Sequence, residues 1–458
     1  MPLRIKWFSF GRLVTCLVLV FAIVRFGNVI LSEFPSATKG DFYMTLPGGY
    51  AETLNPTLWN SPELVIPRME VRQYFPESER DTARTYLHGP TQFLTLYPIV
   101  FLDSYAEIAR LILVVYVALI LFACWVISKS FDFVAEGDPV TRRLLIYGST
   151  LLFYPLLQSL MQREFEVVIL LALALTFWAA IYHRHIVLGG LMAYITWYKF
   201  LPVVFLPYLI ARRWWKSIVA FTALSLVIIG LSEWLFGGIS LFFNNHHFDS
   251  AATNQLTELA SPAAFCSNWA QVDSAGTFAS VRWGLCGLQA RGYWIPLPFS
   301  YFALGGLTAF FGGLGFWGFE QNKQPSLETE RWRRVWELSL VVLIYSTFFR
   351  GHYYYLSALT IPLIALLVRA TSDAPIQKMR LALAVLAYAL LGVFVLPISV
   401  LSAVFEVDVW RFYLEHQLYL LGEVLLLGLV LHEYVKLSFQ VTPSEDRQVP
   451  ATAEAHQT

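Results

Sequence analysis

Two acidic stretches contain the residues best suited to proton transfer. Asp41, in the sequence Gly-Asp-Phe-Tyr, comes shortly after a long apolar run. A partly desolvated carboxylate within reach of a hydroxyl can act as a general base; a helix cap or a solvated loop acid is the alternative. Gln162, Arg163 and Glu164, followed by a second acid at Glu166, lie between two apolar runs. Charges there must pair or face a cavity, so either a polar site or a local ion pair is expected.

Three basic residues could bind a phosphate. Lys199, preceded by Tyr198, interrupts the apolar run 186–211, while Arg350 and His352 precede three consecutive tyrosines. An ammonium or a guanidinium group can hold a phosphate. The alternatives are a snorkelling lysine and an aromatic belt with a solvated base.

Composition indicates what kind of protein must position these residues. Of 458 residues, 57% are hydrophobic and 14% are charged, with 32 Lys and Arg balancing 32 Asp and Glu. Soluble proteins are roughly 45–50% apolar and about 25% charged. These values exclude a disordered chain and a basic nucleic-acid binder, and they argue against a soluble enzyme because so few charges cannot cover so much apolar surface.

The apolar runs predict an all-α polytopic membrane protein of about ten full spans plus a short helical hairpin. A span needs about 20 apolar residues. The run 186–211 is divided at its middle by Lys199 and Pro202, so each half is too short to cross, and we expect it to return to the side that it left. Arg110 and Glu423, in or near spans, are expected to pair inside the bundle. The predicted spans are 12–32, 105–129, 144–161, 164–182, 215–236, 297–319, 334–350, 353–370, 381–404 and 416–437.

Basic residues favour one orientation in the cytoplasmic (inner) membrane. With both termini in the cytoplasm, most Lys and Arg residues fall on the cytoplasmic side, as the positive-inside rule requires. Residues 1–437 then form a single membrane domain with two long extracytoplasmic loops at 33–103 and 237–296, and residues 438–458 form a disordered cytoplasmic tail. The first span lacks the features of a cleaved signal peptide.

The two predicted outer loops contain further candidates. Residues 88–98, from His88 through Tyr97, are amphipathic and are expected to lie on or re-enter the outer membrane surface. Cys266 and Cys286 share the second loop and could form a disulfide outside the cytoplasm. We find no P-loop, dinucleotide fingerprint or zinc spacing, so no nucleotide or metal is expected.

In their order along the chain, these stretches resemble a known family, the polytopic bacterial mannosyltransferases of the GT-C superfamily that use polyprenyl-phosphate-mannose. The resemblance covers about residues 10–370. Two features depart from it: the family turn usually reads Gly-Gln-x-Asn where this chain has Met-Gln-Arg-Glu, and the loop 237–296 has no counterpart. The motifs that carry it are Gly40-Asp41-Phe42-Tyr43, Tyr86-Leu87-His88-Gly89-Pro90, Gln162-Arg163-Glu164, Gly189-Gly190, Lys199-Phe200-Leu201-Pro202, Arg212-Arg213-Trp214-Trp215, His352 and Pro362.

The resemblance implies an inverting transfer of a sugar from a lipid phosphate at the extracytoplasmic face. Asp41 would be the base, and Lys199, His352, Arg350 and Arg163 would hold the donor phosphate. Substrate contacts would come from His88, Tyr97, Gln162, Glu164 and Tyr198. No cofactor is implied beyond the lipid co-substrate, and the expected partners are this donor, a glycolipid or glycan acceptor and membrane lipids, with the enzyme as a monomer and no nucleic acid.

Several alternatives stay open. The sugar could be mannose, arabinofuranose or glucose, and the acceptor a glycolipid, a polysaccharide or a protein. A glycolipid transporter or flippase is the main competing function, although transporters place charges near the midplane between repeated halves, and no repeat is evident here. A non-catalytic assembly protein ranks last.

Overall fold

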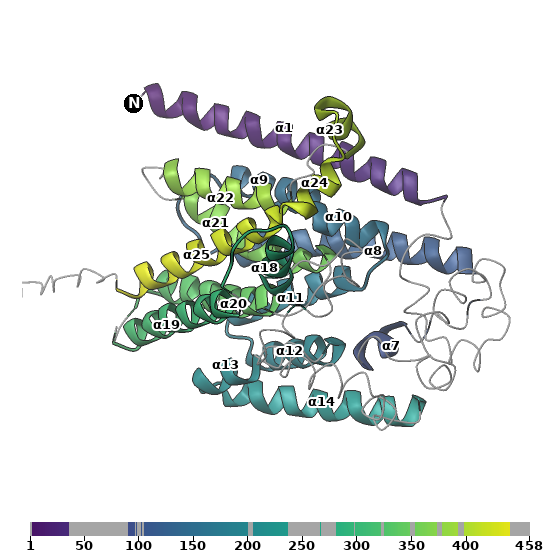
Figure 1. The fold of residues 1–458 in the computed structure, drawn as a ribbon. Helices are drawn as coiled ribbons and strands as arrows, with labels where there is room; N and C mark the ends of the chain where they lie inside the picture. Colours follow the sequence, from purple (N-terminus) through teal and green to yellow (C-terminus); the bar gives the residue numbers. More distant parts are fainter. Residues whose placement is uncertain are drawn as a thin grey trace, which may run out of the picture.

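A computed structural model describes residues 2–35, 90–96, 98, 102, 105–199, 205–236, 266, 281–296, 298–321, 325–348, 353–372, 378–392 and 398–439. Within these residues every regular element is helical, which confirms the all-α class. Figure 1 shows α1 (Pro2–Glu33) along one margin of the bundle and α14 (Trp215–Phe236) along the opposite margin, with the other long helices between them.

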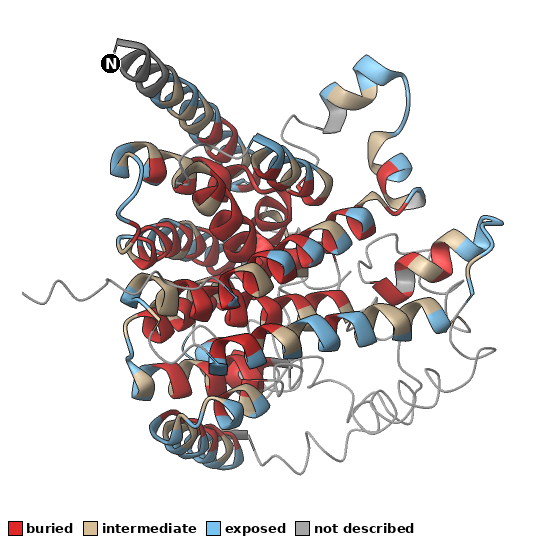
Figure 2. Ribbon diagram, turned by 90° about the vertical axis from the view of Figure 1, so that its left-hand side faces the viewer, coloured by how far each residue is buried: buried red, intermediate tan, exposed pale blue. Residues whose placement is uncertain are grey.

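Five of the described helices are long and apolar enough to cross a membrane. They confirm the predicted spans 12–32, 105–129, 215–236, 297–319 and 416–437. α1 and α14 bury only about a fifth of their apolar window in protein, as Figure 2 also shows, so most of their surface is available to lipid. The five are α1, α8 (Tyr105–Ser130), α14, α19 (Phe299–Gln321) and α25 (Leu418–Ser438).

Within the described residues, the other five predicted spans do not meet these length and composition criteria as single helices. Residues 144–161 form two helices bent by 50°, where a proline enters the first turn of the second helix. At most six spans therefore meet the length and composition criteria within the described residues. The helices in these five regions are α9 (Pro139–Leu152), α10 (Tyr154–Met161), α11 (Glu166–Ile181), α20 (Leu327–Phe348), the 3₁₀ helix η4 (Tyr353–Leu359), α21 (Thr360–Ser372), α22 (Lys378–Leu391) and α23 (Ile398–Phe405).

The predicted hairpin consists of two short helices, α12 (His185–Lys199) and α13 (Phe205–Ala211). The first turn of α12 packs against the first turn of α14: Gly189 lies so close to Ser217 that an added methyl group would collide with its carbonyl, and His185 Nδ1 is 3.4 Å from Ser217 Oγ. The chain therefore comes back to the end of α12 at which it started. Lys199 ends the helix at the opposite end, as expected of a hairpin tip.

Three short helices lie at the ends of the bundle. α7 (Pro90–Leu96), in the predicted amphipathic stretch, packs on α12 and α14. α18 (Val281–Ala290) packs against α19, α20 and α25 and contains Cys286, which forms a disulfide with Cys266. α24 (Val409–Glu415) leads into α25. Apart from these fragments, the predicted outer loops 33–103 and 237–296 and the tail 438–458 fall largely outside the described residues.

An Arg–Glu network joins the hairpin, α19 and α20 at one end of the bundle; we define it as Arg212, Arg333, Arg334, Glu320, Glu330 and Glu337. Arg212 binds Glu330 at 2.7 Å and Arg333 binds Glu337 at 2.9 Å. Arg334 also donates to the carbonyl of Ala180 at 3.0 Å, near the C-terminal end of α11. The network therefore marks one end of α11.

Other basic residues lie at this same end. Tyr182 donates to the carbonyl of Lys129 at 3.0 Å, and the guanidinium of Arg331 lies 5.2 Å from the Tyr182 ring centre. The segments predicted to share the cytoplasmic side thus share one end of the bundle.

Arg110 and Glu423 do not pair as expected. Arg110 is exposed, whereas Glu423, in the second turn of α25, is fully buried. Neither carboxylate oxygen of Glu423 has a hydrogen-bond partner among the described residues. The pairing expectation for Glu423 was therefore wrong.

Candidate functional site

A tight turn between α10 and α11 places two acids inside the protein. Arg163 adopts the left-handed conformation, with φ of 55°, and the N–H of Glu164 donates to the carbonyl of Ser159 at 2.8 Å. The turn buries the side chains of Glu164 and Glu166, which are 2% and 5% exposed. Both acids therefore lie at the N-terminal end of α11, the end opposite the Arg–Glu network.

Glu166 is bound by the tip of the hairpin. The hydroxyl of Tyr198 donates to Glu166 Oε1 at 2.8 Å, and the Tyr198 ring packs on Phe165 with the ring centres 4.9 Å apart. A hydrogen bond to a charged group in a buried setting is stronger than one between neutral groups. The Tyr198–Glu166 hydrogen bond therefore fixes the last turn of α12, whose final residue is Lys199.

Further tyrosines surround the two acids. Tyr116 of α8 interacts electrostatically with Glu164, Glu166 and Tyr194, and Tyr198 interacts with both acids. We call Glu164, Glu166, Tyr116, Tyr194 and Tyr198 the acid–tyrosine cluster. Buried carboxylates surrounded by hydroxyl groups can orient a polar substrate or exchange protons with it.

The short helix α7 adds hydroxyl and amide groups beside this cluster. Thr95 Oγ1 and the Tyr194 hydroxyl are 2.8 Å apart. Thr91 and Gln92 are each 1% exposed, yet Thr91 Oγ1 and Gln92 Oε1 have no hydrogen-bond partner among the described residues. Buried polar atoms are rarely left unpaired without a functional reason, so α7 presents groups that a ligand could satisfy.

The described residues that flank 349–352 approach the same place. Tyr355, in η4, interacts electrostatically with Tyr198, and Tyr345 of α20 interacts with Glu166. Tyr353 anchors the start of η4 by donating to the carbonyl of Leu391 at 2.6 Å. The described residues on either side of 350–352 therefore lie near the tip of α12.

Arg163 is directed to the ends of two other helices. Its guanidinium donates to the carbonyl of Ala109 at 3.2 Å and to that of Glu33 at 2.9 Å, and it is 4.0 Å from the Glu33 carboxylate. It therefore fastens the end of α1 to the start of α8. The C-terminal end of α1 therefore lies at this same end of the bundle.

The structure brings together only part of the predicted site. Glu164 and Tyr198 lie in the acid–tyrosine cluster, while Gln162 ends α10 and donates its N–H to the carbonyl of Gln158 at 2.8 Å. For Lys199 the structure describes the position of the backbone, at the C-terminal end of α12. The remaining predicted residues, Asp41, His88, Tyr97, Arg350 and His352, lie outside the described residues.

Sequence reasoning left out Tyr116, Tyr194 and Glu166 as site residues. Tyr116 lies in the middle of an apolar run, away from the interfaces where tyrosine is usually enriched. This position in the run was the sequence feature that could have indicated Tyr116 as a site residue. Glu166 was visible only as part of an acidic turn, and its partner is 32 residues away.

The fold and this cluster define a class: a polytopic helical membrane protein with a buried polar site at one end of its bundle. The model of glycosyltransferase family 87 matches residues 86–329, which is more than half of the chain, and the protein therefore belongs to that family. The matched range includes the whole acid–tyrosine cluster, α7 and the hairpin. Comparison with curated protein sequences and with solved structures returns no match.

Proposed function

We propose that this membrane glycosyltransferase transfers a sugar, mannose in the first instance, from a polyprenyl-phosphate carrier to an acceptor hydroxyl on the extracytoplasmic face of the cytoplasmic membrane. One observation carries the proposal: regions far apart in the sequence converge on one end of the bundle. The tip of α12 meets Glu166, α7 meets Tyr194, and η4 approaches Tyr198. A lipid-bound substrate entering from the membrane would reach this end without leaving the bilayer.

The proposed reaction is a single displacement with inversion. Asp41 accepts the proton of the acceptor hydroxyl as its oxygen forms a bond to the anomeric carbon, and the bond from that carbon to the phosphate oxygen breaks. Polyprenyl phosphate leaves with the bonding electrons, and Lys199, His352 and Arg350 stabilise its charge. Because the leaving group carries a single phosphate, these cations suffice without a metal. Arg163 is omitted from this set because its guanidinium is bound to backbone carbonyls.

Glu166 and Tyr198 act as positioning residues in this proposal. Their hydrogen bond holds the end of α12 at which Lys199 is the last helical residue. A small displacement of a catalytic group lowers the rate strongly because reacting atoms must be held in a narrow geometry. Glu164 and Tyr116 complete the polar surface on which the sugar hydroxyls would bind, together with Gln162, His88 and Tyr97.

The test is transfer of labelled sugar by the purified full-length protein. Polyprenyl-phosphate-mannose is expected to be consumed with release of polyprenyl phosphate, and parallel reactions with the glucose and arabinofuranose carriers compare the sugars. Glycolipid and glycan acceptors identify the second substrate. Asp41→Asn is expected to lower the rate at least about 100-fold, the usual contribution of a general base. Full activity of Asp41→Asn would refute the assignment of Asp41 as the base. No transfer from any of the carriers would refute the proposal that the donor is a polyprenyl-phosphate sugar.

The competing function is a glycolipid transporter or flippase, favoured by the presence of polar groups buried inside a membrane bundle. It predicts movement of a labelled polyprenyl-phosphate sugar between leaflets of liposomes with no chemical product. Product analysis of the same liposomes separates the two, since a transferase forms a new glycosidic bond. We propose that the enzyme acts as a monomer.

A further inference from the structure

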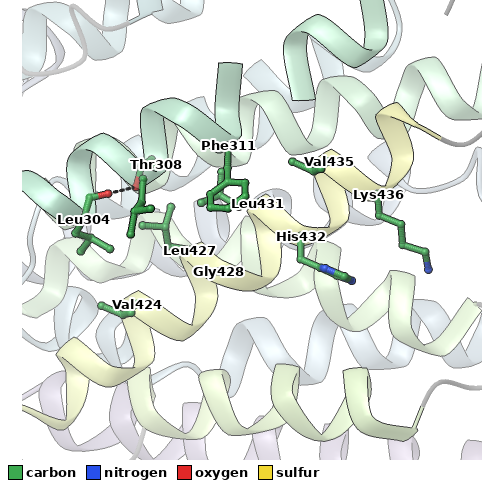
Figure 3. A pocket seen from close by; sticks show the side chains of 11 residues that line it. Leu304, Thr308, Phe311, Val424, Leu427, Gly428, Leu431, His432, Val435 and Lys436 are labelled. Atoms are coloured by element: carbon green, nitrogen blue, oxygen red, sulfur yellow. Dashed lines mark hydrogen bonds between the residues drawn. The ribbon is translucent and has the colours of Figure 1, made fainter. Parts of the chain in front are cut away.

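A groove between α19 and α25 has no part in the acid–tyrosine cluster. Its volume is about 490 Å³, and the described residues that line it all belong to these two helices. Figure 3 shows the two walls, with Leu304, Thr308 and Phe311 labelled on α19 and the other labelled residues on α25. Because α19 is mostly exposed, the groove opens onto the face of the bundle that meets lipid.

The walls of the groove are apolar along most of its length. Leu427 and Leu431 are buried, whereas Leu307 and Phe311 remain 54% and 39% exposed. The one hydroxyl on the α19 wall, that of Thr308, is satisfied by the carbonyl of Leu304 at 2.8 Å. A ligand in this part of the groove therefore needs no polar group.

One end of the groove is basic. His432 and Lys436 lie one helical turn apart and project side by side from α25 (Figure 3). Lys436 is half-buried, and neither residue has a hydrogen bond or an ion pair with any residue that the structure describes. Nearby Arg333 and Arg380, in contrast, are bound to carboxylates at 2.9 and 2.8 Å. A half-buried cation at the end of an apolar channel is complementary to an anion with a hydrocarbon chain.

The length of the groove matches one leaflet. From Val424 to Lys436 the α25 wall extends about 18 Å at 1.5 Å per residue, and half of a hydrocarbon core of about 30 Å is about 15 Å. The basic end lies beside the Arg–Glu network, since Tyr434 donates to Glu337 at 3.1 Å. In the proposed orientation this is the cytoplasmic leaflet, where anionic lipids concentrate.

We propose that this groove binds one acyl chain of an anionic phospholipid, with the headgroup phosphate held by Lys436 and His432. The site is separate from the proposed donor site and independent of which sugar the enzyme transfers. A second copy of the chain is the competing occupant. It would have to bury Lys436 without a complementary acid from the groove itself, because none of the lining residues is acidic.

Gly428 supplies a variant that blocks the groove without disturbing the fold. It lines the groove, and a Cβ atom added there would meet nothing within 4 Å. Replacing glycine in a helix by leucine also favours the helix. Gly306 of α19 is the matched control, because a Cβ atom added there also meets open space and Gly306 does not line the groove.

The first experiment measures lipid binding to the purified full-length protein by native mass spectrometry in a neutral detergent. Phosphatidylglycerol is expected to bind at least about tenfold more tightly than phosphatidylcholine, and glycerol phosphate should not compete at equal concentration. Gly428→Leu and Lys436→Gln should each remove the phosphatidylglycerol preference, whereas Gly306→Leu and Lys436→Arg should retain it. Equal binding of the two lipids by the unaltered protein, or full competition by glycerol phosphate, would overturn the proposal.

The second experiment locates the chain. Benzoylphenylalanine in place of Phe311 should cross-link to phosphatidylglycerol on illumination, and the yield should fall at least fivefold in Gly428→Leu but not in Gly306→Leu. An unchanged yield in Gly428→Leu would mean that only bulk lipid is captured. A protein–protein cross-link that Gly428→Leu abolishes would mean that a second copy occupies the groove. Either result contradicts the proposal.

Discussion

The two ends of α11 bury acids in two different ways. At the C-terminal end, three acids face three arginines in the Arg–Glu network, and Glu337 alone binds Arg212, Arg333, Tyr208 and Tyr434. At the N-terminal end, Glu164 and Glu166 lie among tyrosines, and the adjacent Arg163 is bound to the ends of α1 and α8. Burial of charge is expensive unless it is compensated, so the first arrangement is explained by stability alone. The second places two buried carboxyl groups beside tyrosine hydroxyls, which suits a site that receives a substrate.

The largest expected effect on stability is at Glu337. Glu337→Gln leaves two guanidinium groups partly uncompensated in the protein interior, and we expect a loss of about 3–5 kcal/mol in the free energy of unfolding. Thermal unfolding in detergent measures it. Glu320→Gln is the control, because Glu320 binds the same Arg333 but is 56% exposed, and less than about 1 kcal/mol is expected. Equal losses of stability in the two variants would contradict the predicted difference between the buried Glu337 and the exposed Glu320.

The second prediction compares two tyrosines that donate to carboxylates at opposite ends. Tyr198→Phe removes the 2.8 Å hydrogen bond to Glu166, and a bond to a charged group contributes about 1.5–3 kcal/mol. If this free energy is lost from the transition state of the transfer, the transfer rate should fall about 10- to 100-fold. Tyr208→Phe removes the 3.2 Å bond to Glu337 and should lower the unfolding temperature while the rate per folded molecule stays unchanged. If both variants slow transfer equally, the functional distinction between the two ends is lost.

The third prediction concerns Glu423, a buried acid near Tyr413 and Tyr419 whose carboxyl oxygens have no hydrogen-bond partner among the described residues. Glu423→Leu replaces an unpartnered carboxyl by an apolar side chain of similar size, and the free energy of unfolding should rise by about 1–3 kcal/mol. The same change at Glu337 should lower it. A Glu423→Leu protein less stable than the parent would show that this acid has a stabilising interaction after all.

The smallest effect is expected at Asp138, where the segment before α9 meets α1. The hydrogen bond from Arg12 holds the pKa of the Asp138 carboxyl well below its usual value. A lowered folded-state pKa stabilises the fold above the unfolded value of about 3.9 and ceases to do so as the pH falls through the folded value. Asp138→Asn should therefore destabilise the protein at pH 7 by at most about 1 kcal/mol, and this difference should shrink below about pH 4. A difference between the two proteins that does not change with pH would exclude this ion pair as its source.

Much of the fold could be predicted from apolar run length, and the limits of that signal are visible in two places. Residues 381–404 form one apolar run in the sequence, but α22 ends at Leu391, where Gly392 packs against the ring of Phe153. Residues 164–182 also form one run, yet α11 has 16 residues because the turn at Arg163 takes up the first part. Where a helix stops depends on what it packs against, and a single run of residues does not contain that information.

The candidate site was predictable in outline. The acidic turn, the hairpin tip and the late tyrosines were each recognisable as polar residues in apolar surroundings, and the described parts of these segments do converge. The direction of each side chain was not predictable. Arg163 resembles a phosphate ligand in the sequence, but its side chain turns to the carbonyls of Glu33 and Ala109, contacts that only the packing of α1 and α8 creates.

The shortness of α11 also has a consequence for the surrounding membrane. Sixteen residues extend about 24 Å as a helix, less than a hydrocarbon core of about 30 Å. With the Arg–Glu network at one interface, the acid–tyrosine cluster lies several ångströms below the other, unless the bilayer thins around the bundle to remove this hydrophobic mismatch. A polyprenyl-phosphate headgroup would have to descend by the same amount. The thickness of the bilayer would then change the transfer rate, because it sets how often the headgroup and the site lie at the same depth.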